Sequence, residues 1–146
     1  MLFNILARKI RVFTSTVLLK RDLLMQYAMF DESLYRHQDL QMLADFSAKA
    51  EIGVLNCNLV KIHQDSVINK PNLEKTIAYK EIYLKRMQEH IKKFTLRDQK
   101  RIYCAHHFEV VTAALKERKI NVAIKYLFKV GLNIQAYRDF LKRHLG

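Results

Sequence analysis

The sequence predicts a mostly helical α+β protein whose two parts meet at its only proline, Pro71. Half of the 146 residues are apolar, and glycine and proline are scarce, which favours helices over a β-sandwich or a disordered chain. Before Pro71, helical patterns alternate with short apolar runs, whereas the helical spacing continues from Pro71 to the end. We therefore expect a first part, residues 1–71, with two or three short strands, and a second part, residues 72–146, that forms a helical bundle.

In the first part, the apolar spacing predicts one helix and two strands. The helix is expected over residues 40–50, where apolar side chains recur with a helical period. Two short apolar runs follow, at residues 52–56 and 59–63, with polar residues suited to a turn at 57–58. These runs predict a pair of short strands.

The second part carries signals for four helices in succession. Asn72 and Thr95 are suited to N-caps, because their side-chain oxygens can accept a hydrogen bond from the first helical turn. Gly131 is expected to end a helix, and the apolar pattern resumes after it. The helices are expected at residues 73–94, 96–119, 121–130 and 134–145.

The most informative stretch of the chain is residues 30–39, which read F-D-E-S-L-Y-R-H-Q-D. This string resembles the acceptor-side catalytic motif of the family 2 glycosyltransferases, which have a GT-A fold and invert the anomeric centre. The predicted helix, the two predicted strands and the sequence H-Q-D-S from His63 follow in the order that the family shows. The resemblance covers about residues 13–69, so it matches the rear part of a glycosyltransferase catalytic domain.

The resemblance implies a role for several residues. Asp39 would be the catalytic base, which takes the proton of an acceptor hydroxyl as its oxygen attacks a nucleotide-activated sugar. His63 would contact the diphosphate or its divalent metal, Mn or Mg, as imidazole can do. The residues that would shape the acceptor pocket are Asp31, Glu32, Arg36 and Gln38.

The chain departs from the family pattern in three side chains and in one missing half. Ala28, Gln41 and Asp45 stand where the family commonly has a glycine, an acid and an arginine. No Asp-x-Asp element occurs in the sequence, and no nucleotide-binding half precedes the motif. We therefore expect a fragment, a truncated reading frame or one piece of a split enzyme, inactive alone and without a tightly bound metal. Its partners would be the missing N-terminal half, a nucleotide sugar and a glycan or lipid-linked acceptor, as in cell-surface polysaccharide biosynthesis.

Charge is concentrated in the second part. The whole chain has a formal net charge of +12, and residues 72–146 hold seventeen basic and seven acidic residues. Such a basic surface is attracted to anionic lipid headgroups. No apolar run approaches the roughly 20 residues that span a bilayer, no signal peptide is evident, and two cysteines cannot form a disulfide framework. We expect a cytoplasmic protein in peripheral contact with the inner face of the membrane.

Two other functions remain open from the sequence. The first, which ranks below the transferase, is a non-catalytic basic helical module that binds an enzyme or a scaffold. Nucleic-acid binding is disfavoured, because the basic residues spread over several helix faces and no helix-turn-helix glycine turn is present. A metal site at His90, Cys104, His106 and His107 is not expected either, because neighbouring histidines on a helix point about 100° apart and no chelating spacing occurs.

Overall fold

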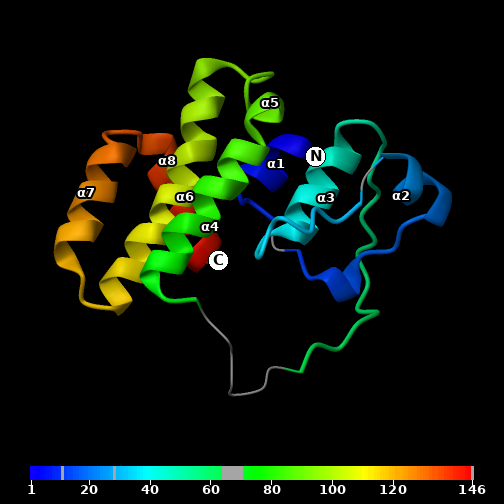
Figure 1. The fold of residues 1–146 in the computed structure, drawn as a ribbon, viewed down its shortest axis with the longest axis horizontal. Coiled ribbons are helices and arrows are strands. Elements are labelled where there is room, and N and C mark those ends of the chain that lie inside the picture. The colour runs from blue at the N-terminus through cyan, green and yellow to red at the C-terminus, as the bar shows by residue number, and fades with distance from the viewer. Residues whose placement is uncertain (11, 28, 64–70, 146) are drawn as a thin grey trace.

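The computed structural model describes residues 1–10, 12–27, 29–63 and 71–145. Every regular element in these residues is a helix (Figure 1). Before Pro71 they are α1 (Leu2–Leu6), a 3-10 turn (Thr14–Thr16), α2 (Arg21–Tyr27) and α3 (Gln38–Ser47). After it they are α4 (Leu73–Arg86), α5 (Gln88–Ile91), α6 (Leu96–Lys116), α7 (Ile120–Val130) and α8 (Ile134–Leu145).

The predicted α+β class is wrong, and so is the GT-A-like arrangement expected for residues 1–71. The two predicted strands, residues 52–56 and 59–63, belong to no element in the described chain. Their apolar side chains are largely exposed, with Val54 at 78 % and Leu55 at 75 %. A short apolar run indicates only a local preference for the extended conformation. A strand also requires a neighbouring strand with which its backbone forms hydrogen bonds.

The helical second part is confirmed, with one break that the sequence did not signal. The helix expected over residues 73–94 is two helices, α4 and α5, separated at Met87, where the backbone leaves the helical region (φ −86°, ψ 1°). Neither glycine nor proline marks this point. The other three predicted helices match α6, α7 and α8 to within a few residues.

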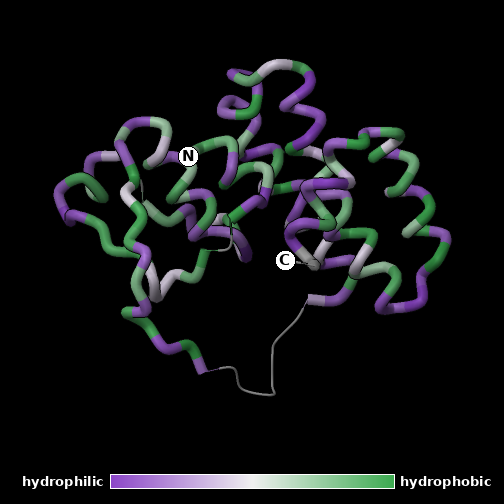
Figure 2. Tube along the Cα trace, turned by 180° about the vertical axis from the view of Figure 1, so that it is seen from behind, coloured by the Kyte–Doolittle hydropathy of each residue, from purple (hydrophilic) through white to green (hydrophobic). Residues whose placement is uncertain are grey.

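Helix α6 lies at the centre of the second part. It packs against α4, α7 and α8, and α6 and α7 form a helical hairpin. The turn of this hairpin contains Arg118 in the left-handed region, with φ at 58°. Polar and apolar residues alternate every few positions along these helices, so each has one side suited to the interior (Figure 2). The residues buried where α4, α6 and α7 meet are Leu73, Val110, Val111, Ala114, Ala123 and Tyr126.

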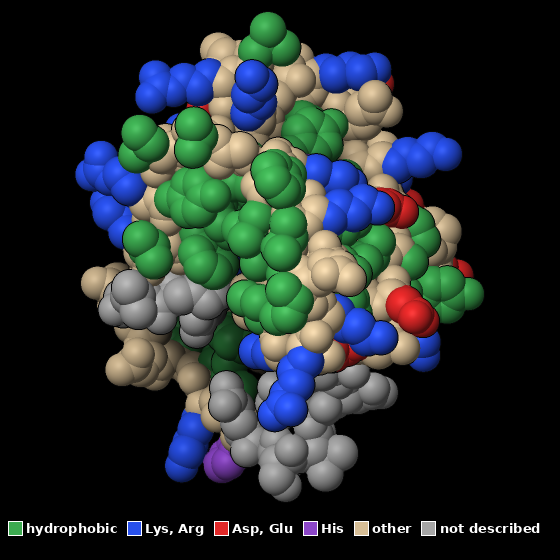
Figure 3. All heavy atoms as spheres, turned by 90° about the vertical axis from the view of Figure 1, so that its left-hand side faces the viewer, with side chains coloured by type: hydrophobic (Ala, Val, Ile, Leu, Met, Phe, Trp, Pro, Cys, Tyr) green, Lys and Arg blue, Asp and Glu red, His purple; other side chains and the backbone are tan. Residues whose placement is uncertain are grey.

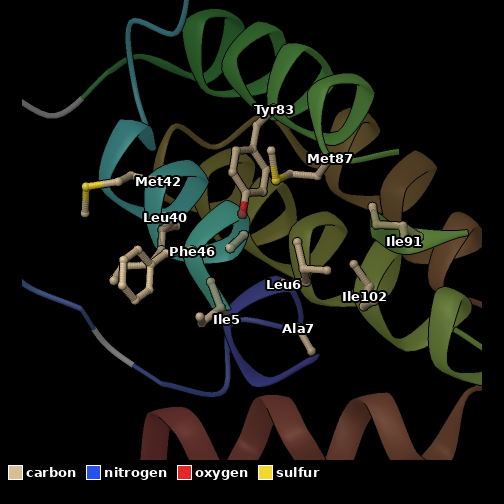
Figure 4. Close-up of a cluster of buried hydrophobic side chains, with 12 residues drawn as sticks. Ile5, Leu6, Ala7, Leu40, Met42, Phe46, Tyr83, Met87, Ile91 and Ile102 are labelled. Atoms are coloured by element: carbon tan, nitrogen blue, oxygen red, sulfur yellow. The ribbon is translucent and has the colours of Figure 1, made fainter. Parts of the chain in front are cut away.

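The largest cluster of buried apolar side chains combines residues from before and after Pro71. Leu6 of α1 and Leu40 of α3 are almost fully buried beside Tyr83 of α4 and Ile102 of α6 (Figure 4). Met87, at the break between α4 and α5, has no exposed surface in this cluster. Because burying such side chains contributes about 1.5–3 kcal/mol each, this cluster is what fixes the motif helix α3 against α4 and α6.

Thr95→Ala is expected to lower the free energy of unfolding by about 1 kcal/mol. The Thr95 hydroxyl accepts a hydrogen bond from the Asp98 amide at 3.2 Å and so satisfies one donor at the start of α6. Urea denaturation followed by circular dichroism measures the change. Thr95→Ser keeps the accepting oxygen and should retain most of the stability, whereas an alanine variant as stable as the parent would contradict this role for the cap.

Candidate functional site

The motif residues form a loop that leads directly into α3. Asp39 lies in the first turn of this helix and is half-buried, and its Oδ1 accepts a hydrogen bond from the Leu40 amide at 2.8 Å. None of the ion pairs found in the described residues involves Asp39. Its carboxylate is therefore not neutralised by a neighbouring cation within this part of the chain.

Asp31 holds the motif loop in place. Its Oδ1 accepts hydrogen bonds from the amide and the hydroxyl of Ser33, and its Oδ2 accepts one from Arg86 Nε at 2.9 Å. The hydrogen bonds from Ser33 and then from Arg86 lower the pKa of Asp31 below its usual value. Gln38 Nε2 donates to the Asp31 carbonyl at 3.4 Å. The Asp31 carboxylate thus stabilises the loop through Ser33 and connects it to α4 through Arg86.

Gln41 and Asp45, two of the departures from the family pattern, lie at the centre of one hydrogen-bonded network. The buried Gln41 accepts from the Asp31 amide at 2.9 Å and donates to Asp45 Oδ2 at 2.6 Å. Asp45 in turn pairs with Arg86 Nη2 at 3.3 Å and with His90 Nε2 at 2.6 Å. Asp45 thus links α3 to Arg86 at the end of α4 and to His90 in α5.

The remaining predicted site residues, Glu32, Arg36 and His63, are exposed. No hydrogen bond found in the described residues joins His63 to the motif. The rest of the H-Q-D-S sequence, residues 64–66, lies outside the described residues. Within the described chain, no three His, Cys, Asp or Glu side chains lie together in a way that could hold a metal ion. The contact of His63 with a metal or a diphosphate stays a prediction.

A second polar cluster, which the sequence did not reveal, surrounds Glu109 on α6. Its Oε1 accepts from Arg8 Nε at 2.9 Å and from Arg143 Nη1 at 2.7 Å, and its Oε2 accepts from Lys80 Nζ. Burial lowers the pKa of Lys80 to about 8 despite the attraction of Glu109. Burial alone would raise the pKa of Glu109, yet Lys80 and Arg8 hold it well below its usual range. One carboxylate thus joins α1, α4, α6 and α8.

Three rings lie next to this cluster and stay uncharged at neutral pH. His37 and His106 each lie 5.3 Å from the ring of Tyr83, measured between centroids. His106 Nε2 is 3.0 Å from the Leu6 carbonyl, so this nitrogen carries the proton and donates. Burial, followed by the charges of Lys80 and Arg8, lowers the pKa of His37 to about 3. Burial likewise lowers the pKa of His106 well below 6.5 and raises the pKa of Tyr83.

Asp39 lines neither of two hollows found among the described residues. One is a cavity of about 10 Å³ between Arg8, Arg101 and Arg143, only about large enough for a single water. The other is an open groove of about 710 Å³ where α6 begins and α7 ends. The acceptor pocket around Asp39 stays a prediction.

No protein-family model, no curated protein and no solved structure matches this chain. The likeness to glycosyltransferases thus rests on the motif residues themselves. In the described part of the chain, no helix combines the length and the apolar character needed to cross a membrane.

Proposed function

We propose that this chain provides the acceptor-side part of a family 2 inverting glycosyltransferase, with Asp39 as its catalytic base. The proposal rests on the motif, since the described residues around it form helices and no sheet. One observation carries it: Asp31 and Asp45 are both held by Arg86, whereas the hydrogen bond found for the Asp39 carboxylate within the described residues comes from a backbone amide. A base must keep its lone pair for the reacting proton, and Asp39 is the half-buried carboxylate of the motif that meets this requirement.

In this proposal the chemistry of the chain is confined to one proton transfer. The Asp39 carboxylate accepts the proton of a sugar hydroxyl while the hydroxyl oxygen forms its bond to the anomeric carbon of the donor. The bond from that carbon to the diphosphate breaks on the opposite face, which inverts the centre. The network of Asp31, Gln41 and Arg86 fixes the loop that positions Asp39. Donor and metal binding would belong to a nucleotide-binding half, as the resemblance to the family implies.

The test is complementation. The chain is mixed with the separately produced nucleotide-binding half of a family 2 enzyme, and transfer from a radiolabelled nucleotide sugar to a glycan acceptor is measured. Asp39→Asn is expected to reduce turnover by about 10²–10⁴-fold, the range for loss of a general base, with little change in helicity. The matched control is Glu51→Gln, which removes an exposed carboxylate outside the motif and should retain turnover. Unchanged turnover in Asp39→Asn, or no transfer with any donor half, would contradict the proposal.

A non-catalytic interaction module is the second candidate, and one feature favours it. The outward side of α7 presents apolar side chains next to lysines and arginines, a surface that no described element covers (Figure 3). Such a surface marks a binding site on many proteins and requires no catalytic residue. Under this candidate, Asp39→Asn would change nothing in the complementation assay, while substitutions on α7 would abolish binding.

A further inference from the structure

The apolar side chains of helix α7 cover a wider part of its circumference than the part that is buried against the other helices. Ala123, Tyr126 and Val130 are buried against the rest of the second part. Four further apolar residues are exposed, and at 100° per residue they fall within an arc of about 100° beside the buried one. These four are Ile120, Ile124, Leu127 and Phe128, with exposed fractions from 37 % to 82 %. Folding of the described chain therefore does not explain this arc.

The exposed apolar surface continues past the end of α7. Leu132, in the turn before α8, is 100 % exposed, and Ile134 is 75 % exposed. Both border the open groove, whose other lining includes Arg97, Lys100 and Lys129. In Figure 3 the apolar side chains form one broad area with lysines and arginines at its edge. We define the α7 face as Ile120, Ile124, Leu127, Phe128, Leu132 and Ile134.

The charges near the α7 face are almost entirely positive. Residues 110–146 contain eight basic and two acidic residues. Both acidic side chains form a contact with another part of the chain. Glu117 accepts from the Leu73 amide at 2.6 Å, and Asp139 pairs with Arg101 at 2.8 Å. The basic residues of this region that flank the face, such as Lys125 and Lys129, are exposed. An occupant of the face must therefore be apolar at its centre and negative at its edge.

We infer that the α7 face binds the surface of an anionic membrane. Phe128, Leu132 and their neighbours enter the boundary between headgroups and acyl chains, while Lys125 and Lys129 stay at the level of the lipid phosphates. The combination matches an interfacial apolar face, which gains from buried apolar area and from attraction to anionic lipid together. The inference does not rest on Asp39 or on the proposed transferase.

Two other occupants fit the observations less well. A second copy of the chain would bring two positive edges together, and like charges across an interface oppose association. An acidic amphipathic peptide would satisfy the charge, but such a helix needs a groove that holds its anchors. Of the α7 face, the open groove is lined only by Leu132 and Ile134, and Leu132 is fully exposed there. The four apolar residues on α7 itself lie outside this lining, so the groove does not hold anchors along the helix. A bilayer requires no such groove.

The absence of tryptophan from the sequence makes a direct test possible. In Phe128→Trp, the new indole is the only one, and its emission reports the polarity around the α7 face. We expect a shift to shorter wavelength with vesicles of equal parts phosphatidylcholine and phosphatidylglycerol, and none with phosphatidylcholine alone. The matched control is Leu18→Trp, at a position that is 95 % exposed and three residues before α2, a helix that lies on the opposite side of the molecule from α7 (Figure 1). Its emission should stay unchanged with both vesicles.

Sedimentation with the same anionic vesicles supplies the second measurement. Phe128→Asp and Leu132→Asp should each weaken binding about tenfold or more, the loss expected for one inserted side chain, whereas Leu18→Asp should bind like the parent. Because Phe128 and Leu132 are both exposed, neither substitution should unfold the protein. Thermal melts establish that the variants stay folded. Equal binding of all variants, or an equal shift of the Leu18→Trp control, overturns the inference.

The remaining outcomes also decide between occupants. A blue shift of Phe128→Trp that grows with protein concentration in the absence of vesicles shows that a second copy covers the face, and it overturns the inference. If the protein does not bind vesicles that contain phosphatidylglycerol but does bind an acidic amphipathic peptide, the inference is overturned as well. Because no nucleotide sugar or glycan is present, failure here leaves the role of Asp39 untouched, and failure of the complementation assay leaves the α7 face untouched.

Discussion

Glu109→Gln is expected to lower the free energy of unfolding by about 3 kcal/mol, the lower end of the range for breaking a buried ion pair. The substitution keeps the size of the side chain but removes the negative charge that Arg8, Lys80 and Arg143 share. Lys80 is affected most, because it is only 5 % exposed and loses the attraction that opposes the lowering of its pKa by burial. The lower end applies because the side chain of Glu109 is itself 19 % exposed.

Urea denaturation at neutral pH measures this effect. The matched control is Glu89→Gln, which removes the fully exposed partner of Lys92 on α5 and should leave the unfolding midpoint unchanged. If Glu109→Gln is as stable as Glu89→Gln, the three cations find other partners and the cluster does not contribute to stability.

Acid is expected to destabilise the fold progressively between pH 6.5 and pH 3. The folded pKa of His37 is lowered to about 3, and that of His106 also lies well below its usual 6.5. In this window the unfolded chain binds protons that the folded chain does not, so stability is complete above pH 6.5 and decreases as the pH falls. Each histidine contributes a slope of up to about 1.4 kcal/mol per pH unit. Below about pH 4.5, protonation of Glu109 adds to the loss, because its folded pKa is lowered as well.

The free energy of unfolding, measured by urea denaturation at a series of pH values, tests this expectation. His106→Gln removes one titrating group but keeps a donor for the Leu6 carbonyl, so the slope of stability against pH should become smaller. His63→Gln is the control, since His63 is exposed and its replacement should leave the slope unchanged. A parent protein whose stability is the same at pH 4 and pH 7 would show that these rings are accessible to protons.

The helices after Pro71 could be predicted because their signals are local. Thr95 caps α6 as expected, and Gly131, with φ at 60°, ends α7. The break at Met87 could not be predicted, because neither glycine nor proline marks it and Met87 itself is buried in the main cluster. The prediction of two strands was wrong for a related reason, because the apolar run at residues 52–63 does not identify a strand with which it could pair. Local patterns identify what a segment can form, and contacts decide what it does form.

In the candidate site too, the contiguous residues could be predicted from the sequence and their distant partners could not. The loop from Asp31 to Asp39 was recognised because its residues are contiguous in the sequence. The groups that hold it, Arg86 and His90, come from 41 to 55 residues further along, and no spacing rule connects them to the motif. The Glu109 cluster was missed entirely, because Arg8 and Glu109 are 101 residues apart. A buried Gln41 four residues before Asp45 is the one local signal that would have indicated the network.

The ion pairs of Glu109 also impose an order on events during synthesis. Arg8 precedes Glu109 by 101 residues, and Arg143 follows it by 34. Until α8 has been synthesised, Glu109 lacks one of the three cationic partners that it has in the folded state. The contacts around this carboxylate are therefore formed in full only after the chain has been extended through α8.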